Sequence, residues 1–179
     1  MFLSVQNSLA ILVDREFPHL IIPLKQDSPT HPYGTQYSGD IEVKAGSHQV
    51  YTEISFDIPS NSARSCNLAF TIATGNPGAP WTLSGDDSGP KIFNISYISP
   101  AMNQSRDAWD QDTRPAVQDW VATVQVDYDG SVTINGGRVS CAKGQVAQFL
   151  MYPGSTRDFS LTWYEEADPI NGIIYEMYT

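Results

Sequence analysis

A tryptophan flanked by acidic residues is the strongest candidate for a functional site in this sequence. Trp109 stands in the polar stretch 105–112 together with four side chains that can hydrogen-bond a ligand: Asp107, Asp110, Gln111 and Asp112. An indole ring can stack on the face of a sugar while carboxylate and amide groups bind its hydroxyls. The pattern therefore predicts a ligand-binding loop. The alternative is that Trp109 packs as a lid on the protein and the acidic side chains are solvated.

The same aspartates are the only side chains that suggest a metal. Asp107, Asp110 and Asp112 could hold Ca²⁺ through oxygen ligands, although their spacing matches no established calcium loop. Residues 127–130, Asp-Tyr-Asp-Gly, lack the downstream Glu of such a loop and suit a β-hairpin turn better. The sequence therefore predicts no metal site and no cofactor, with Ca²⁺ as the one ion left open.

Signals for catalysis are weak throughout the chain. Glu53 and Asp57 are the only local carboxylate pair on one face of a predicted strand. Glycoside hydrolysis needs two carboxylates that face each other across a cleft, and an exposed sheet face explains this pair better. The adjacent acids at 86–87 and 165–166 are expected to lie in solvated turns, and no serine stands in a nucleophile elbow.

The elements that position these residues are predicted to be strands. In residues 50–58 apolar and polar side chains alternate, Pro59 ends the run, and residues 66–72 alternate again after a polar turn. About ten such short segments, with no convincing amphipathic helix, predict an all-β fold of two antiparallel sheets, a jelly-roll-like β-sandwich. Residues 115–120 are expected to make a single helical turn.

Length and charge narrow the class of protein further. The 179 residues fit one domain, 1–179, in which residues 1–16 form an extra edge strand or a tail. A net charge of −10 argues against nucleic acid and anionic membranes as partners. The apolar run 9–13 is too short for a membrane span and lacks the flanking signals of a signal peptide. Nothing in the sequence specifies an oligomeric state.

Two cysteines and two Asn-x-Ser tripeptides are candidates for covalent modification. Cys66 and Cys141 are the only cysteines, and they are either buried free thiols or a disulfide. The turn-rich composition, with 17% charged residues, is typical of secreted β proteins and favours the disulfide. Asn94 and Asn103 each begin an Asn-x-Ser tripeptide, so both are predicted N-glycosylation sites of a glycoprotein.

Several segments resemble those of a known family. They are Phe-Pro-His-Leu-Ile-Ile-Pro at 17–23, Tyr-Gly-Thr-Gln-Tyr at 33–37, Phe-Asp-Ile-Pro at 56–59, Cys-Asn-Leu-Ala-Phe at 66–70, Cys-Ala-Lys-Gly-Gln at 141–145 and Gly-Ile-Ile-Tyr at 172–175. Together they resemble the fungal But-two C-terminal domain family over nearly the whole chain from Phe17. The resemblance implies a secreted or wall-associated fungal β-sandwich with a disulfide typical of the family. Residues 71–75 depart from the family pattern, which places a proline sooner after the Cys-x-Leu-x-Phe segment.

We therefore expect a secreted protein, extracellular or attached to the cell wall, that works by binding rather than by catalysis. Its expected partner is a glycan or a protein on a cell wall or host surface. The alternatives are a polysaccharide-active enzyme and a purely structural component of the cell wall.

Overall fold

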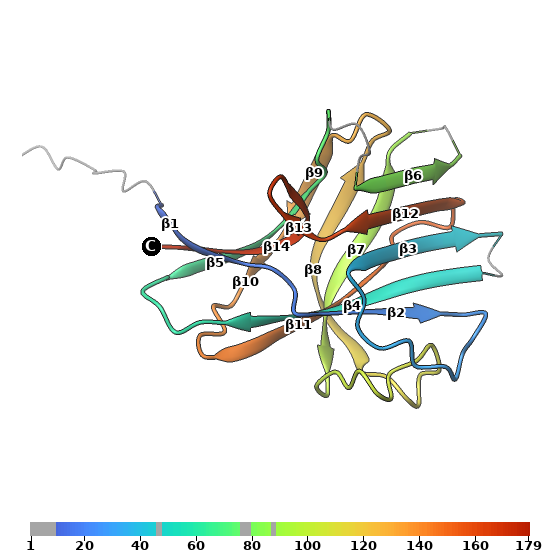
Figure 1. Cartoon of the computed structure of the whole chain (residues 1–179), viewed down its shortest axis with the longest axis horizontal. Helices are drawn as coiled ribbons and strands as arrows, with labels where there is room; N and C mark the ends of the chain where they lie inside the picture. The colour runs from blue at the N-terminus through green and yellow to red at the C-terminus, as the bar shows by residue number, and fades with distance from the viewer. Residues whose placement is uncertain (1–9, 46–47, 76–79, 87–88) are drawn as a thin grey trace, which may run out of the picture.

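The computed structural model describes residues 10–45, 48–75, 80–86 and 89–179. These residues form fourteen strands and no helix, and all strand pairs are antiparallel. Two sheets face each other in Figure 1, which confirms the predicted all-β sandwich. The prediction of about ten strands was low because three further elements, at 12–16, 138–139 and 166–167, are short pairings at sheet margins.

The larger sheet has nine strands. They are β2 (Leu20–Lys25), β3 (Ser38–Lys44), β4 (His48–Ile58), β6 (Trp81–Gly85), β7 (Lys91–Ser99), β8 (Ala116–Val126), β9 (Val132–Gly136), β11 (Gln145–Pro153) and β12 (Phe159–Tyr164). Their order is β6-β12-β3-β4-β11-β7-β8-β9, and β2 pairs with β4 beside this path.

The smaller sheet has five strands. They are β1 (Leu12–Glu16), β5 (Ser65–Thr71), β10 (Arg138–Val139), β13 (Glu166–Ala167) and β14 (Ile170–Tyr178). Their order is β1-β14-β5-β10, and β13 pairs with β14 off this path. Within the range 1–16, predicted as an edge strand or a tail, residues 12–16 form β1, and residues 1–9 lie outside the described part of the chain.

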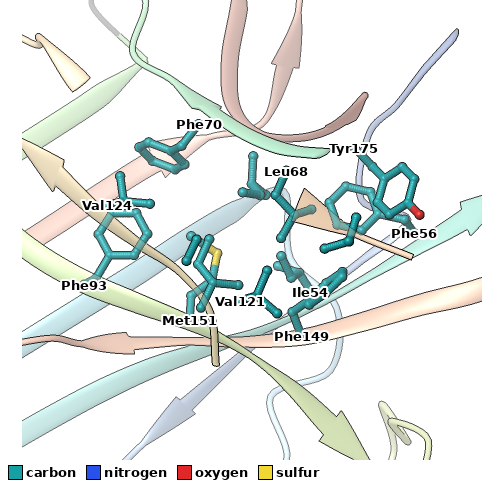
Figure 2. Close-up of a cluster of buried hydrophobic side chains, with 14 of the residues drawn as sticks. Ile54, Phe56, Leu68, Phe70, Phe93, Val121, Val124, Phe149, Met151 and Tyr175 are labelled. Carbon is teal, nitrogen blue, oxygen red and sulfur yellow. The ribbon is translucent and has the colours of Figure 1, made fainter. Parts of the chain in front are cut away.

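The main core lies between the two sheets. Figure 2 shows that it is built from the inward-facing side chains of both, with Phe56 near both Tyr175 and Phe149, and Phe70 near Phe93. Ile54 and Phe56 point into this core because alternate residues of β4 face opposite sides of the sheet. We call the core-facing side of the larger sheet its inner face and the opposite side its outer face.

A disulfide joins Cys66 to Cys141 and confirms the prediction that the thiols are paired. Cys66 is fully buried in β5, opposite Val139 of β10, and Cys141 follows two residues later. The bond closes a loop of 75 residues in sequence separation. The chain-entropy model gives about 4–5 kcal/mol of stabilisation for a loop of that length.

Of two predictions made for the segments at the ends of β8, one is confirmed and the other is wrong. Residues 127–130 form the hairpin turn between β8 and β9, with Gly130 at a φ of +83°. Residues 116–120 belong to a strand, so the predicted helical turn was wrong. The cause is tertiary: Ala116 and Val117 pair with Ser99 and Ile98 of β7, and this ladder overrides a weak local preference.

A second, smaller apolar cluster covers part of the outer face. Its buried members are Ile22, Leu24 and Leu150 from β2 and β11. Five partly buried side chains pack on them: Tyr51, Ile98, Met102, Trp109 and Tyr152. Met102 and Trp109 come from the loop between β7 and β8, so this loop acts as a cover over the outer face. Among the described residues, no helix reaches the length and apolar character that a membrane span requires.

Candidate functional site

The loop formed by residues 100–115 carries every ligand-binding residue that the sequence predicts. It joins β7 to β8 and lies at the lower end of the molecule in Figure 1, in yellow-green and yellow. Two hydrogen bonds attach it to its surroundings: Met102 N donates to Gln148 Oε1 (3.1 Å) and Asp110 N donates to Pro29 O (2.8 Å). The first bond ties the loop to β11, and the second ties it to the loop after β2.

Trp109 anchors this loop to the sheet. Its ring lies 4.6 Å from the ring of Tyr51 on β4, measured between centroids. The guanidinium of Arg114 lies 5.8 Å from the centroids of both rings, and Arg114 Nε donates to the Trp109 carbonyl oxygen (3.0 Å). Trp109 is half-buried by these contacts. The structure therefore places it as a packed part of the loop.

Asp107 lies beneath the loop, next to Glu53 of β4. Both side chains are fully buried, and both oxygens of Glu53 and Oδ1 of Asp107 have no hydrogen-bond partner among the described residues. Asp107 Oδ2 accepts from Asn103 N (2.5 Å). The expectation that Glu53 lies on an exposed sheet face was wrong, because the loop covers that part of the face. Asp57 does lie on it, with its side chain 72% exposed.

Burial raises the pKa of both carboxyl groups of this pair. The pKa of Glu53 is raised to about 8, mainly because burial penalises the ionised form and secondly because the Asp107 charge repels it. Arg114 opposes this effect and lowers the pKa. The pKa of Asp107 is also raised by burial, although its bond from Asn103 N favours the ionised form. Glu53 is therefore mostly protonated at neutral pH and lies as a neutral group next to Asp107.

The remaining predicted residues differ in their access to solvent. Asp110 is half-buried and shapes the loop, since its Oδ1 accepts from Asp112 N (3.2 Å). Gln111 and Asp112 are exposed, and with Arg114 they line a shallow cleft of about 380 Å³. The floor of this cleft continues through Pro115 and Ala116 to Val117.

The sequence did not predict two exposed apolar residues of β8, of which the first, Val117, lines this cleft. Val117 pairs with Ile98 and Trp120 pairs with Ser96, so an irregular register in β8 turns both side chains to the outer face. Trp120 is 52% exposed and Val117 43% exposed. The interpretation of residues 115–120 as a helical turn hid this arrangement, and no signal in the sequence marks the register shift.

Contacts with Gly136 and Thr123 fix the position of the Trp120 ring. A Cβ on Gly136 of β9 would lie 2.7 Å from the Trp120 ring, so the ring packs on bare backbone there. Its Nε1 donates to Thr123 Oγ1 (3.1 Å), and Thr123 donates onward to Asn94 Oδ1 (2.7 Å). We call the group formed by Gln111, Asp112, Arg114, Val117 and Trp120 the β8 surface.

The predicted glycosylation sites and metal ligands are also placed. Asn94 is half-buried on β7, whereas Asn103 is exposed in the loop, where its Oδ1 accepts from Ser105 N (3.1 Å). Glycosylation of either stays a prediction. In the described ranges, no three His, Cys, Asp or Glu side chains converge where they would share a metal ion.

Comparison with known proteins finds a family model that matches this chain. The family model described as the Ubiquitin 3 binding protein But2 C-terminal domain matches residues 16–169. This range includes the larger sheet, the loop 100–115 and both cysteines. No curated protein matches the chain.

Proposed function

We propose that this chain, which belongs to the But2 C-terminal domain family, is a non-enzymatic binding module that recognises a glycan through the β8 surface. It is a secreted fungal protein, extracellular or attached to the cell wall, and its ligand lies on a cell wall or a host surface. The observation that carries this proposal is that β8 presents an exposed indole, Trp120, and begins at a cleft with a carboxylate, an amide and a guanidinium.

The chemistry of the β8 surface suits a sugar. A half-exposed indole offers a flat apolar face to the C–H groups of a pyranose ring. The Trp120 ring is held rigidly by its packing on Gly136 and by its hydrogen bond to Thr123. Sugar hydroxyls both donate and accept, so Asp112 can accept, Arg114 can donate, and Gln111 can do either. A shallow cleft with few convergent polar groups is the usual form of such a site.

The disulfide supports the secreted location. Cytosolic thiols are kept reduced, whereas disulfides persist in extracellular proteins. Cys66 and Cys141 are joined in this fold, and the bond is partly enclosed by the core. The net charge of −10 agrees with a partner that is not a nucleic acid.

A protein partner is the second candidate, supported by the family description itself, which names a protein that binds ubiquitin 3. Exposed tryptophan and arginine are also enriched at the centres of protein interfaces. Trp120 and Arg114 would serve as the anchors of such an interface. The two candidates share the β8 surface and differ in the ligand.

Binding assays on variants of the whole chain separate these candidates. We expect the wild type to bind members of a glycan array or fungal wall polysaccharide, and Trp120→Ala to weaken this binding at least tenfold. The matched control is Tyr164→Ala, because Tyr164 is 56% exposed but lies on β12, away from β8. Unchanged binding by Trp120→Ala would refute the β8 surface as the glycan site. Capture of a protein partner that depends on Trp120, without binding to any glycan, would favour the second candidate.

A further inference from the structure

We propose that a cleft beneath the start of β2 is a second binding site, which accepts a neutral, hydroxyl-rich ligand such as a mono- or disaccharide. The cleft measures about 510 Å³. Its walls come from residues 17–21 before and in β2, the loop 35–37, and residues 165–167 after β12. It shares no residue with the β8 surface, so the inference stands independently of the proposed function.

Glu165 is one of the polar groups that line this cleft. Its Oε2 accepts from Trp163 Nε1 (3.1 Å) and from Ile173 N (3.2 Å), and these two bonds fix the carboxyl. Its Oε1 is buried and has no hydrogen-bond partner among the described residues. The expectation that Glu165 lies in a solvated turn was therefore wrong. A buried polar atom without a partner is rare in folded proteins and calls for an explanation, and a ligand group that enters from the cleft supplies one.

The surrounding backbone is built to hold this carboxyl. Gly172 has a φ of +110°, and a Cβ there would lie 2.2 Å from Glu165 Oε2, so only glycine leaves room for the group. Glu165 N also donates to the carbonyl of Tyr37 (3.0 Å), which ties the floor of the cleft to its wall. Trp163, the donor to Oε2, is fully buried and cannot move aside.

The charge state of Glu165 indicates a neutral ligand. Burial raises its pKa to about 8, and the bonds from Ile173 N and Trp163 only partly oppose this effect. At neutral pH the carboxyl is mostly protonated, and its two acceptor bonds at Oε2 leave the proton on Oε1. Glu165 can then donate this hydrogen to a ligand oxygen. An anionic ligand would face Glu166 in the same cleft and the overall negative charge of the chain.

The walls supply the other contacts that a sugar requires. Tyr37 is 88% exposed and offers its ring, and Phe17 lines the cleft as a second apolar wall. Thr35 Oγ1 accepts from Ile21 N (3.1 Å), which leaves its hydroxyl hydrogen to donate. Gln36 Nε2 donates to Tyr33 O (3.0 Å), which leaves the side-chain oxygen of Gln36 to accept. Aromatic faces and complementary hydroxyl partners are thus present together.

The indole N–H of Trp163 provides a direct readout, because it donates to the carboxyl that the ligand would touch. The folded chain is titrated with neutral methyl glycosides of glucose, galactose, mannose and N-acetylglucosamine, and the tryptophan indole signals are followed by ¹H–¹⁵N NMR. We expect at least one glycoside to shift the Trp163 signal saturably. Tyr37→Ala should weaken this binding at least tenfold without affecting the fold, since its side chain is so exposed. Glu165→Ala should abolish it, and Glu165→Gln, which keeps a donor, should retain most of it.

The control variant is Trp120→Ala, which should leave the Trp163 titration unchanged and so separates this cleft from the β8 surface. Glucuronate and glucosamine serve as charged probes and should bind at least tenfold more weakly than the neutral glycoside. The proposal is overturned if no glycoside produces a saturable shift, if Tyr37→Ala leaves the shift unaltered, or if a charged probe binds more tightly than the neutral ones.

Discussion

Replacing Glu53 by glutamine tests the buried acid pair beneath the loop. Glutamine has the same shape, stays neutral at every pH, and carries a hydrogen-bond donor as a protonated Glu53 does. The variant therefore keeps the packing of β4 against the loop and removes only one titration. Asp57→Asn, on the same strand and the same face but 72% exposed at its side chain, is the matched control.

The sign of the effect follows from where the proton is held. Below pH 4.5 Glu53 is protonated in both the folded and the unfolded chain, so its titration contributes nothing to stability. Between pH 4.5 and about 8 the unfolded chain releases this proton while the folded protein retains it. Wild-type stability therefore falls with rising pH across this window and becomes level above it. Glu165 titrates in the same direction in both proteins, so its contribution cancels in the comparison.

The magnitude follows from the width of that window. The difference between the ordinary pKa of Glu53 and its pKa in the folded protein sets the size of the effect. At about 1.4 kcal/mol per pKa unit, it corresponds to about 3–5 kcal/mol of free energy of unfolding at and above pH 8. We expect Glu53→Gln to match the wild type near pH 4.5, to exceed its free energy of unfolding by about 3 kcal/mol at pH 7, and to exceed it by the full amount at pH 8.5.

Urea denaturation at pH 4.5, 6, 7 and 8.5, with the disulfide intact, measures this difference. Asp57→Asn should change the free energy of unfolding by no more than about 0.5 kcal/mol at any of these pH values, because it is a surface group. A gap between Glu53→Gln and wild type that stays constant over the whole range would refute the reasoning. That result would mean that Glu53 is ionised in the folded protein.

Two further perturbations test the disulfide and the loop anchor. The double variant Cys66→Ala, Cys141→Ala should lower the free energy of unfolding by about 4–5 kcal/mol in urea titrations, since it releases a loop of 75 residues, and an effect below about 1 kcal/mol would contradict that estimate. Trp109→Ala should release the loop from Tyr51 and accelerate tryptic cleavage at Arg106, whose side chain is 56% exposed, whereas an unchanged cleavage rate would show that Trp109 does not anchor the loop.

Strand periodicity was sufficient to predict the core, and the outer face was where it failed. The alternation in residues 50–58 correctly assigns Ile54 and Phe56 to the core, because a two-residue period fixes which side chains share a face. It cannot show what covers the opposite face. Glu53 was placed in solvent because the loop that buries it is contributed by residues far along the chain.

The candidate site was predicted in part for similar reasons. Trp109 and its acidic neighbours were found from residue type, but their separation into buried Asp107 and exposed Asp112 depends on how the loop lies on the sheet. Trp120 was missed because a register shift in β8, set by pairing with β7, decides which way it points. Glu165 was expected in a solvated turn, because the sequence does not show that Gly172 and Trp163 enclose its carboxyl group.

The position of β14 in the smaller sheet has a consequence for biosynthesis. Among the described strands, β14 lies between β1 and β5, so β1 is joined to the smaller sheet through β14 alone. Until residues 170–178 have emerged from the ribosome, β1 and β5 have no common partner and one side of the core stays open to water. The sandwich must therefore close late, after translation of nearly the whole domain, and the nascent chain exposes apolar surface that chaperones can bind.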